Sequence, residues 1–288
     1  MQPELIKARS FLGLDTDYAD SRLVIFGAPY DSTTSYRPGA RQGPAAIRAE
    51  SYALESYSPH QDRDVYDYPI HDAGDLELPF GNSERMLDQV EQTTAHFLAD
   101  GKLPVILGGE HLITLGSFRA TLKKHPDLHL IHFDAHTDLR QDYLGEELSH
   151  ATVIRRCWDL VGDGHIFQFG IRSGDRPEFI WAKDHTSLCQ NNFAALPAAV
   201  EYLKGRPVYL TIDLDVLDPA EFPGTGTPEA GGVSYPELMQ ALAAVAGLNI
   251  VACDLMELAP GLDPSYRSVS LAGKVLRELL LLLAGGPL

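Results

Sequence analysis

Short segments that are apolar at nearly every position recur along this chain, and most are separated by intervals long enough for a helix. Strands of this kind are typical of a sheet that is covered on both faces. Their alternation with helices predicts an α/β fold with a mainly parallel sheet between helical layers. We expect roughly eight strands, at residues 22–26, 65–70 (the weakest), 104–107, 128–133, 165–170, 185–189, 207–212 and 249–254.

Three of the intervals carry signals that are typical of helix ends, such as a proline in the first turn, an Asn or Ser cap, or a closing glycine. No repeat, low-complexity tract or linker composition interrupts the sequence pattern, so we expect a single domain over residues 1–288. The three predicted helices are 43–56 (Pro44), 82–101 (Asn82 or Ser83, and Gly101) and 234–247 (Ser234, Pro236 and Gly247).

Acidic and histidine side chains gather where three of the apolar runs end. In open α/β sheets, ligands bind beyond the carboxyl ends of the strands, so these side chains are expected to converge on one site. After the strand at 128–133, the spacing of two residues predicts that three of them point to the same side of an extended chain. The six residues are His111 in LPVILGGEH, Asp134, His136 and Asp138 in LHLIHFDAHTD, and Asp213 and Asp215 in PVYLTIDLD.

The composition of this set indicates which metal it would hold. Carboxylates without any thiolate favour manganese or magnesium, and the two imidazoles shift the preference toward manganese. Four carboxylates balance two divalent ions, whereas a single ion would leave about two buried negative charges uncompensated. We therefore expect a dinuclear Mn²⁺ site. His132 shares the spacing of the set but lies inside the apolar run, so we expect it to support the site without binding metal.

The overall charge limits the partners of the chain. The formal net charge of −17 argues against binding to nucleic acid or an anionic membrane, because both are polyanions, but it is compatible with a small cationic substrate.

The first 15 residues lack the apolar core of a signal peptide, and the apolar run near residue 280 is too short to cross a bilayer. Three scattered cysteines without CxxC spacing fit a reducing compartment. We expect a cytoplasmic protein.

These motifs, in this order, closely resemble those of the ureohydrolase superfamily, which contains the arginases and agmatinases. The resemblance covers nearly the whole chain, and the second aspartate motif with its PGTGTPE continuation is its most specific part. The matching segments are RPGARQGPAAIR (37–48), GGEH (108–111), DAHTD (134–138), SH (149–150), TIDLDVLDPAEFPGTGTPEAGG (211–232) and DLMELAP (254–260).

The resemblance implies an arginase-like three-layer αβα fold, a homo-oligomer (trimer or hexamer) and roles for the six residues. Asp134 and Asp213 would bridge the two manganese ions. The remaining ligands would divide into two pairs, His111 with Asp138 and His136 with Asp215. Two positions depart from the family pattern: Glu110 stands where many relatives have Asp, and Ala151 stands where Gly is common.

The resemblance also implies a reaction. A metal-bridging hydroxide can attack the carbon of a guanidinium, which free water scarcely attacks, and collapse of the adduct to urea requires a proton for the departing amine. His150 matches the histidine that carries this proton, and Glu257 matches the carboxylate that holds the guanidinium by paired hydrogen bonds. Asp254 is expected to brace the loop of Glu257 without touching the substrate.

The segment LRQDYLGEELSHAT, after the DAHTD motif, bears on the choice of substrate. It lacks the Asn- and Ser-rich loop with which arginases hold an α-carboxylate, and it resembles the corresponding segment of bacterial agmatinases. Its acids Asp142, Glu146 and Glu147 would attract the ammonium of agmatine, or would only solvate the loop. Hydrolysis of agmatine to putrescine and urea is therefore the first expectation, with guanidinobutyrate, guanidine and arginine as other substrates.

Two other classes of protein are compatible with parts of the pattern. Histone-deacetylase-like hydrolases share the sheet architecture but use one zinc ion, and they would not need His111 or the second aspartate of each pair. A non-enzymatic, metal-binding regulatory homologue is the other class. It is less favoured because every expected metal ligand is present in the sequence.

Overall fold

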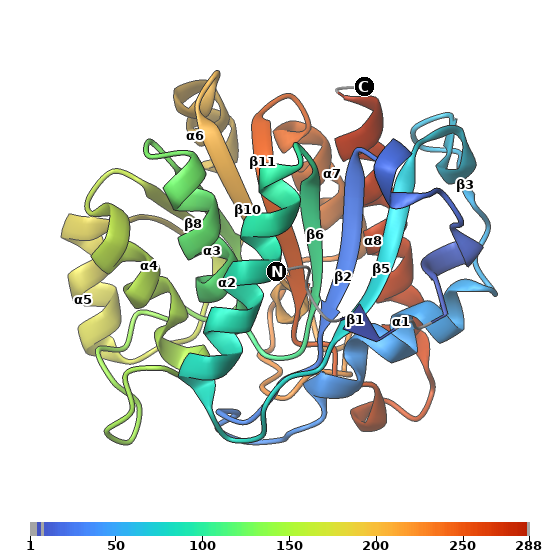
Figure 1. Ribbon diagram of the computed structural model, residues 1–288. Coiled ribbons are helices and arrows are strands. Elements are labelled where there is room, and N and C mark those ends of the chain that lie inside the picture. Colours follow the sequence, from blue (N-terminus) through green and yellow to red (C-terminus); the bar gives the residue numbers. More distant parts are fainter. Residues whose placement is uncertain (1–4, 7–8, 287–288) are drawn as a thin grey trace.

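The computed structural model describes residues 5–6 and 9–286. Nine strands form one sheet in the order β1-β5-β2-β6-β11-β10-β7-β8-β9 (Figure 1). All neighbouring strands in it are parallel except β1 and β5. The strands of the sheet are β1 (Leu5–Ile6), β2 (Leu23–Ala28), β5 (Ile70–Leu76), β6 (Leu103–Gly108), β7 (His129–Phe133), β8 (Ile166–Ile171), β9 (Ser187–Gln190), β10 (Pro207–Asp213) and β11 (Asn249–Met256), and a separate hairpin pairs β3 (Tyr57–Ser58) with β4 (Arg63–Asp64).

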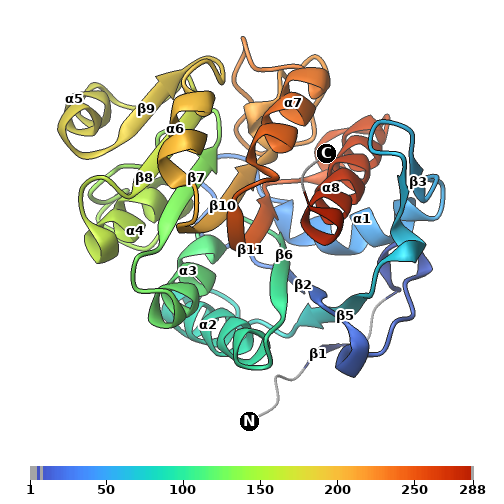
Figure 2. The same ribbon diagram turned by 90° about the horizontal axis from the view of Figure 1, so that it is seen from above.

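Helices cover both faces of the sheet, as Figure 2 shows for α7 and α8 on one side and α2 and α3 on the other. Two separate hydrophobic cores result, and alternate residues of β2 contribute to each: Leu23 and Ile25 to one, Val24 and Phe26 to the other. The first core takes residues from α1 (Gly43–Ser51), α6 (Leu196–Leu203), α7 (Tyr235–Val245) and α8 (Arg267–Gly285), and the second from α2 (Ser83–Ala99), α3 (Ile113–Lys124), α4 (Val153–Val161) and α5 (Arg176–His185). The predicted α/β, three-layer fold is confirmed.

Seven of the eight predicted strands lie where the apolar runs predicted them. The prediction for residues 65–70 is wrong, because Val65–Asp67 form a short 3₁₀ helix and β5 begins only at Ile70. The Asp64 carboxylate accepts a hydrogen bond from the backbone N–H of Tyr66 at 3.0 Å, and this cap starts the turn. The other 3₁₀ helices are Phe11–Gly13, Tyr18–Asp20, Ala40–Gln42, His150–Thr152, Leu214–Val216 and Pro260–Leu262.

The predicted helix starts at Asn82 and Ser234, and the predicted end at Gly101, agree with the observed caps. The Asn82 side chain accepts a hydrogen bond from the N–H of Arg85 at 3.0 Å at the start of α2, and Gly101 follows the helix with a φ of 73°. Ser234 forms a reciprocal capping box with Glu237 at the start of α7. Helix α1 ends at Ser51, five residues before the end that the sequence suggested.

The apolar run near residue 280 lies in α8, where Leu279–Leu283 are buried against the sheet. It is therefore part of the core. Across residues 5–6 and 9–286, no helix combines the length and the apolarity that crossing a bilayer would require.

The order of the central strands positions the candidate site. β6, β11, β10 and β7 are neighbours and run parallel, so their carboxyl ends meet at one edge of the sheet. The chain leaves β6 through Gly109, which packs against the backbone of Tyr30 so closely that a Cβ atom there would lie 1.8 Å from the Tyr30 oxygen. Glycine at this position lets the loop after β6 come close to the neighbouring strand.

Candidate metal centre

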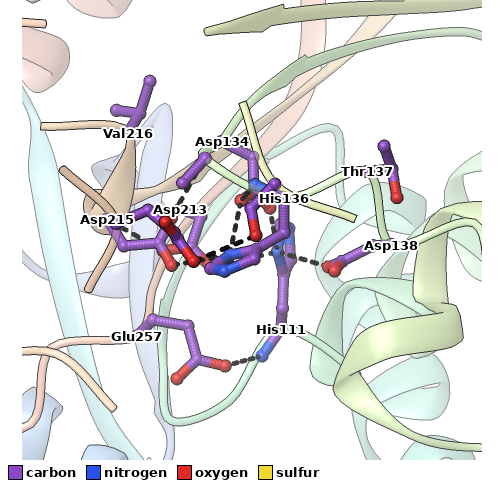
Figure 3. A network of polar contacts seen from close by, with 12 residues as sticks. His111, Asp134, His136, Thr137, Asp138, Asp213, Asp215, Val216 and Glu257 are labelled. Carbon is purple, nitrogen blue, oxygen red and sulfur yellow. Dashed lines mark hydrogen bonds and ion pairs between the residues drawn. The ribbon is translucent and has the colours of Figure 1, made fainter. Parts of the chain in front are cut away.

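The ends of β6, β7 and β10 and the loops that follow them bring all six predicted metal ligands together (Figure 3). His111 follows β6, and the DAHTD segment follows β7. Asp213 is the last residue of β10, and Asp215 lies in the 3₁₀ helix that continues from it. Glu257 comes directly after β11 and points at the same cluster.

Three carboxylates surround one nitrogen of His111. Its Nδ1 lies 3.1 Å from Oδ2 of Asp134, and 3.3 Å from Oδ2 of both Asp138 and Asp213. All four side chains are buried. One nitrogen and three oxygens thus converge on a small volume, which is the kind of donor set that a divalent ion needs.

A second set of donors lies beside the first. Nδ1 of His136 is 3.0 Å from Oδ2 of Asp215 and 3.5 Å from Oδ1 of Asp134. Asp134 therefore presents one oxygen to each set, as expected of a carboxylate that bridges two ions. Asp213 presents Oδ2 to the first set, while its Oδ1 accepts the backbone N–H of Asp215 at 2.8 Å.

Two buried atoms show that the cluster suits a cation. Among the described residues, neither Nδ1 of His111 nor Oδ2 of Asp215 has a hydrogen-bond partner. Leaving such atoms unpaired away from water is costly, and a metal ion would satisfy both. Burial, and then the adjacent carboxylates, also raise the pKa of Asp213 well above its usual range, because several negative charges share one site.

A hydrogen-bonded relay orients the His111 ring. Its Nε2 lies 2.8 Å from Oγ1 of Thr211, and the Thr211 hydroxyl donates to Oδ1 of the buried Asp254 at 2.6 Å. Because Thr211 gives its only proton to Asp254, it must accept from Nε2–H, which leaves Nδ1 free to face the three carboxylates. Histidine metal ligands are usually held in this way. Asp254 was expected to brace the loop of Glu257, but its carboxylate accepts hydrogen bonds from Thr211, Thr114 and Tyr209 and so supports the His111 ring instead. Sequence reasoning did not single out Thr211, a polar residue inside an apolar strand.

We expect the substitution Thr211→Val to lower manganese affinity by about 10–100-fold, the usual effect of removing a group that orients a metal ligand. Valine keeps the shape of the side chain but cannot accept the His111 proton. Titration of manganese followed by its bound stoichiometry measures the effect. Thr114→Val is the matched control: the Thr114 hydroxyl also donates to Asp254, at 2.9 Å, and lies 3.3 Å from the Thr211 hydroxyl, but among the described residues it forms no hydrogen bond to the His111 ring. Equal affinity in the Thr211 variant and the native protein would contradict the relay.

His132, which lies within β7, supports the cluster by a hydrogen bond to Asp134. Its Nε2 lies 2.7 Å from Oδ2 of Asp134, and its Nδ1 lies 3.1 Å from Nε2 of Gln168. The Gln168 amide also points to the carbonyl of Thr137 at 2.8 Å, so its nitrogen is a donor on both sides. His132 therefore accepts at Nδ1 and donates from Nε2 to Asp134, which agrees with a supporting role.

His150 and Glu257 lie together at the open side of the cluster. Nδ1 of His150 is 3.8 Å from Oε1 of Glu257, and its Nε2 accepts the backbone N–H of Ser35 at 3.2 Å. Burial, and then the neighbouring imidazoles of His136 and His111, lower the pKa of His150 to about 4. Oε1 of Glu257 accepts the backbone N–H of His111 at 2.8 Å, and Glu257 holds a left-handed φ of 66° that turns it toward the site.

Glu110, the departure from the family pattern, points away from the metal ligands. Its carboxylate accepts the N–H and the hydroxyl of Thr33, at 2.8 and 2.6 Å, and burial raises its pKa to about 7. Oγ1 of Thr33 in turn accepts the backbone N–H of His150 at 3.0 Å. Glu110 thus anchors the loop that carries Ser35 and connects it to His150.

A cleft of about 220 Å³ leads from solvent to the cluster. Sequence reasoning did not identify the charged residues at its mouth, Asp175, Glu178 and Arg140, which follow β8 and β7. Arg140 pairs with Asp175 at 2.6 Å. The residues that line the cleft are Ser35, His136, Thr137, Asp138, Arg140, Tyr143, His150, Ala151, Ser173, Gly174, Asp175, Glu178, Asp213 and Thr227.

The acids expected to attract the substrate tail lie elsewhere. Asp142, Glu146 and Glu147 are not among the described residues that line the cleft. Asp142 accepts the N–H of Gly145 within its own turn, and Glu147 lies 3.5 Å from a guanidinium nitrogen of Arg156. These contacts agree with the alternative interpretation given above, in which the acids only solvate the loop and do not bind the substrate.

The backbone of the DAHTD segment also differs from the prediction. We expected an extended chain that points Asp134, His136 and Asp138 to one side, but β7 ends at Phe133, and Asp138 has a left-handed φ of 52°. Asp138 reaches the cluster through this turn. The prediction that these three side chains converge therefore agrees with the structure, but the extended backbone from which it was derived does not continue to Asp138.

We expect removal of bound metal to destabilise the protein more as the pH rises. Burial, and then Asp134, raise the pKa of Asp138 from its ordinary 3.8 to about 7. Without metal, the folded protein therefore keeps a proton that the unfolded chain releases. The stability from this proton is complete below about pH 4 and is lost as the pH rises through about 7. His136 acts in the same direction: burial lowers its pKa, but Asp215 and Asp134 outweigh burial and raise it well above 6.5.

The measurement is the melting temperature with excess manganese and with a chelator, at several pH values from 5 to 8. The difference between the two should widen with pH, because manganese replaces the protons that the site loses. At a manganese concentration 100 times the dissociation constant, the gain is about 2.7 kcal/mol. A difference that stays constant over this range would show that these groups do not bind the metal.

Comparison with known proteins gives matches over almost the whole chain. The model of the arginase family matches residues 21–282. A protein named agmatinase from Bacillus anthracis is 48% identical over 283 residues, covering 96% of this chain and 97% of that protein. A guanidinobutyrase from Pseudomonas aeruginosa is 35% identical, covering 94% and 88%. The crystal structure of the agmatine ureohydrolase of Thermoplasma volcanium has a TM-score of 0.87 at 33% identity, covering 96% of this chain and 95% of that one.

Proposed function

Because this chain belongs to the arginase family, we propose that it is a ureohydrolase that converts agmatine to putrescine and urea. The observation that carries the proposal is the pair of donor sets that share Asp134, with His150 and Glu257 beside them. The similarity to proteins named agmatinase, at 46–48% identity, supports agmatine as the substrate.

We propose that the first donor set holds one manganese ion through His111, Asp134, Asp138 and Asp213. The second set would hold the other ion through His136 and Asp215, with Asp134 and Asp213 completing it. The unpartnered Nδ1 of His111 and Oδ2 of Asp215 support these two places. When bound, a pair of such ions supplies a water molecule activated as a nucleophile at neutral pH.

The residues beside the donor sets would position the guanidinium and move its proton. Glu257 is buried, and its carboxylate can accept two charge-assisted hydrogen bonds from the planar cation while the N–H of His111 fixes its direction. His150 lies 3.8 Å from this carboxylate, so its ring can reach the same bound group. Its Nε2 accepts the N–H of Ser35, so Nδ1 carries the ring proton that faces the guanidinium. His150 would take up the proton that the nucleophilic water loses and pass a proton to the leaving amine, so that the ring is neutral before and after the step.

The mouth of the cleft suits an ammonium at the far end of the substrate. The Asp175 side chain is 58% exposed there, and it lies at the entrance with the buried Glu178 behind it. The exposed Asp175 carboxylate would take the role that sequence reasoning gave to the acids of the preceding loop. The net charge of −17 adds a general attraction for a cation.

Arg140 favours a second candidate, the hydrolysis of a guanidino acid such as guanidinobutyrate. It lines the same cleft, and its guanidinium lies against the ring of Tyr143 at 5.2 Å. A carboxylate at the end of the substrate could pair with it if Arg140 left Asp175. The similarity to the guanidinobutyrase agrees with this possibility.

The experiment is urea release from agmatine, arginine, guanidinobutyrate and guanidine, each with added manganese. The proposal requires agmatine to have the highest kcat/KM of the four. Faster turnover of guanidinobutyrate would establish the second candidate. A manganese-loaded protein that releases no urea from any of them would contradict both and would favour a non-enzymatic role.

We expect Asp175→Asn to raise the KM for agmatine several-fold and to leave the turnover of guanidine unchanged, since guanidine has no tail to reach the mouth. The expected change follows from the loss of one exposed ion pair, worth about 0.2–1 kcal/mol, and from the unpaired Arg140 that then repels the ammonium. Asp184→Asn, on the exposed surface of α5, is the control. An unchanged KM for agmatine would remove Asp175 from the tail-binding site.

We also propose that residues 1–288 form one ureohydrolase domain and that the chain assembles as a trimer or hexamer. The continuous nine-stranded sheet supports the first statement, and the family resemblance is the basis of the second. Light scattering after size exclusion would give three or six times the mass of the chain.

A further inference from the structure

A second cluster of imidazole and carboxylate side chains lies at the opposite edge of the sheet. His129 is the first residue of β7, His165 directly precedes β8, and Asp127 lies two residues before His129. One ligand atom from each lies within 4.8 Å of the others. Five residue steps along β7 separate His129 from Asp134, or about 17 Å at the usual rise of a strand. The cluster is therefore separate from the centre described above.

The hydrogen bonds of both imidazoles leave the same nitrogen free. Nδ1 of His129 lies 2.8 Å from the carbonyl oxygen of Asp127, and Nδ1 of His165 lies 3.0 Å from the carbonyl oxygen of Asp163. A carbonyl only accepts, so both rings carry their proton on Nδ1 and keep a lone pair on Nε2. This arrangement, with one nitrogen donating to a carbonyl, is the usual one for histidines that bind a metal.

The arrangement arises from a short motif that occurs twice. The sequences are Asp-Leu-His at 127–129 and Asp-Gly-His at 163–165, and each leads into one of two adjacent parallel strands. The repeated spacing gives both rings the same hydrogen bond to the residue two positions earlier. The ring centroids are 4.6 Å apart, at an interplanar angle of 33°.

The Asp127 carboxylate is held so that one oxygen faces the imidazoles. Its Oδ2 lies 3.3 Å from Nη1 of Arg206, which directly precedes β10, the other neighbour of β7 (Figure 2). Its Oδ1 lies 3.9 Å from Nε2 of His165. This distance is too long for a direct hydrogen bond and leaves space between the two atoms for a shared cation.

The surroundings keep His129 in the form that binds metal. The residue is buried, and the ring of Tyr202 packs edge-on against it with centroids 6.0 Å apart. Burial lowers its pKa, the hydrogen bond to Asp127 partly opposes this effect, and the nearby His165 lowers it further. The imidazole is therefore neutral at physiological pH.

We propose that Asp127, His129 and His165 bind a divalent transition metal ion, with zinc as the preferred ion. Two imidazole nitrogens and one carboxylate oxygen are a common zinc donor set, and water can take the fourth position. The two imidazoles distinguish this set from the carboxylate-rich one that favours manganese. A bound ion would tie together the amino ends of β7 and β8, with Arg206 connecting them to β10.

The test compares full-length native protein with the variants His165→Asn and Asp127→Asn. Each is loaded with excess manganese, then dialysed against zinc in slight excess, and the zinc content per chain is measured by mass spectrometry. Any zinc that replaces manganese at the carboxylate-rich centre raises the measured zinc content of all samples equally. We expect both variants to hold one zinc ion fewer per chain than the native protein, with urea release unchanged.

His185→Asn is the matched control. His185 is as exposed as His165, with 30% against 28% of the side chain accessible, and it pairs with Asp163 at 2.8 Å from outside the cluster. This variant should keep the zinc that the other two lose. Zinc should also raise the melting temperature of the native protein and of His185→Asn, but not of His165→Asn. Equal zinc contents in the native protein, His165→Asn and Asp127→Asn would overturn the proposal, whatever the activity toward guanidino compounds.

Discussion

Replacing Asp215 by alanine will remove one of two manganese ions and reduce urea release by more than about 100-fold. Loss of a residue that only orients a ligand costs about 10–100-fold, and loss of the ligand itself should cost more. Oδ2 of Asp215 is buried, has no hydrogen-bond partner among the described residues and lies 3.0 Å from Nδ1 of His136. Without it, the second donor set keeps too little negative charge to hold its ion.

The measurement is the manganese content of the purified variant, together with kcat at saturating agmatine. Asp184→Ala, an exposed aspartate on α5, is the control for the change of residue type and should retain both ions. Two ions per chain and full activity in the Asp215 variant would refute the dinuclear assignment. One zinc ion and no manganese per chain, with the same zinc content in His165→Asn, would point instead to the mononuclear, deacetylase-like class.

Replacing His150 by asparagine will lower kcat by about 10²–10⁴-fold, the usual contribution of a general acid or base, while both metal ions remain bound. His150 lies 3.8 Å from Glu257 and forms its other contacts with the loop of Ser35, so its loss leaves both donor sets intact. Asparagine can still accept the N–H of Ser35. It has no titratable group that could pass a proton to the leaving amine.

This effect is measured as kcat and KM over a range of pH, with the metal content determined on the same samples. His60→Asn, on an exposed loop, is the control. An unchanged kcat would exclude His150 from proton transfer. Loss of manganese would assign it to the metal site instead.

The sequence predicted the architecture because the determining signals are local. Seven apolar runs became strands, and clusters of Asp and His at three of their ends became one centre. Both results follow from the rule that the carboxyl ends of parallel strands meet at one edge. The strand predicted from residue 65 did not form because the Asp64 cap starts a 3₁₀ helix there, and this outweighs the strand tendency of the neighbouring residues.

What the sequence did not predict depends on contacts between distant segments. Thr211 resembles any β-branched residue of a buried strand until His111, 100 residues away, is placed against it. Asp175 follows β8 in a turn whose position at the mouth of the cleft depends on how β8 packs beside β7. The left-handed backbone of Asp138 likewise has no signature in the DAHTD motif. The family resemblance predicted the metal ligands and the proton carrier, but not Thr211 or the turn at Asp138.

The order of the central strands also affects when the centre can form. Its donors follow β6, β7 and β10, and the carboxylate after β11 joins a donor 146 residues earlier. During synthesis on the ribosome, the set therefore stays incomplete until β10 has emerged and taken its place between β7 and β11. A metal ion would therefore meet the complete donor set only when the sheet is nearly finished, and the nascent chain would offer it only partial sets before then.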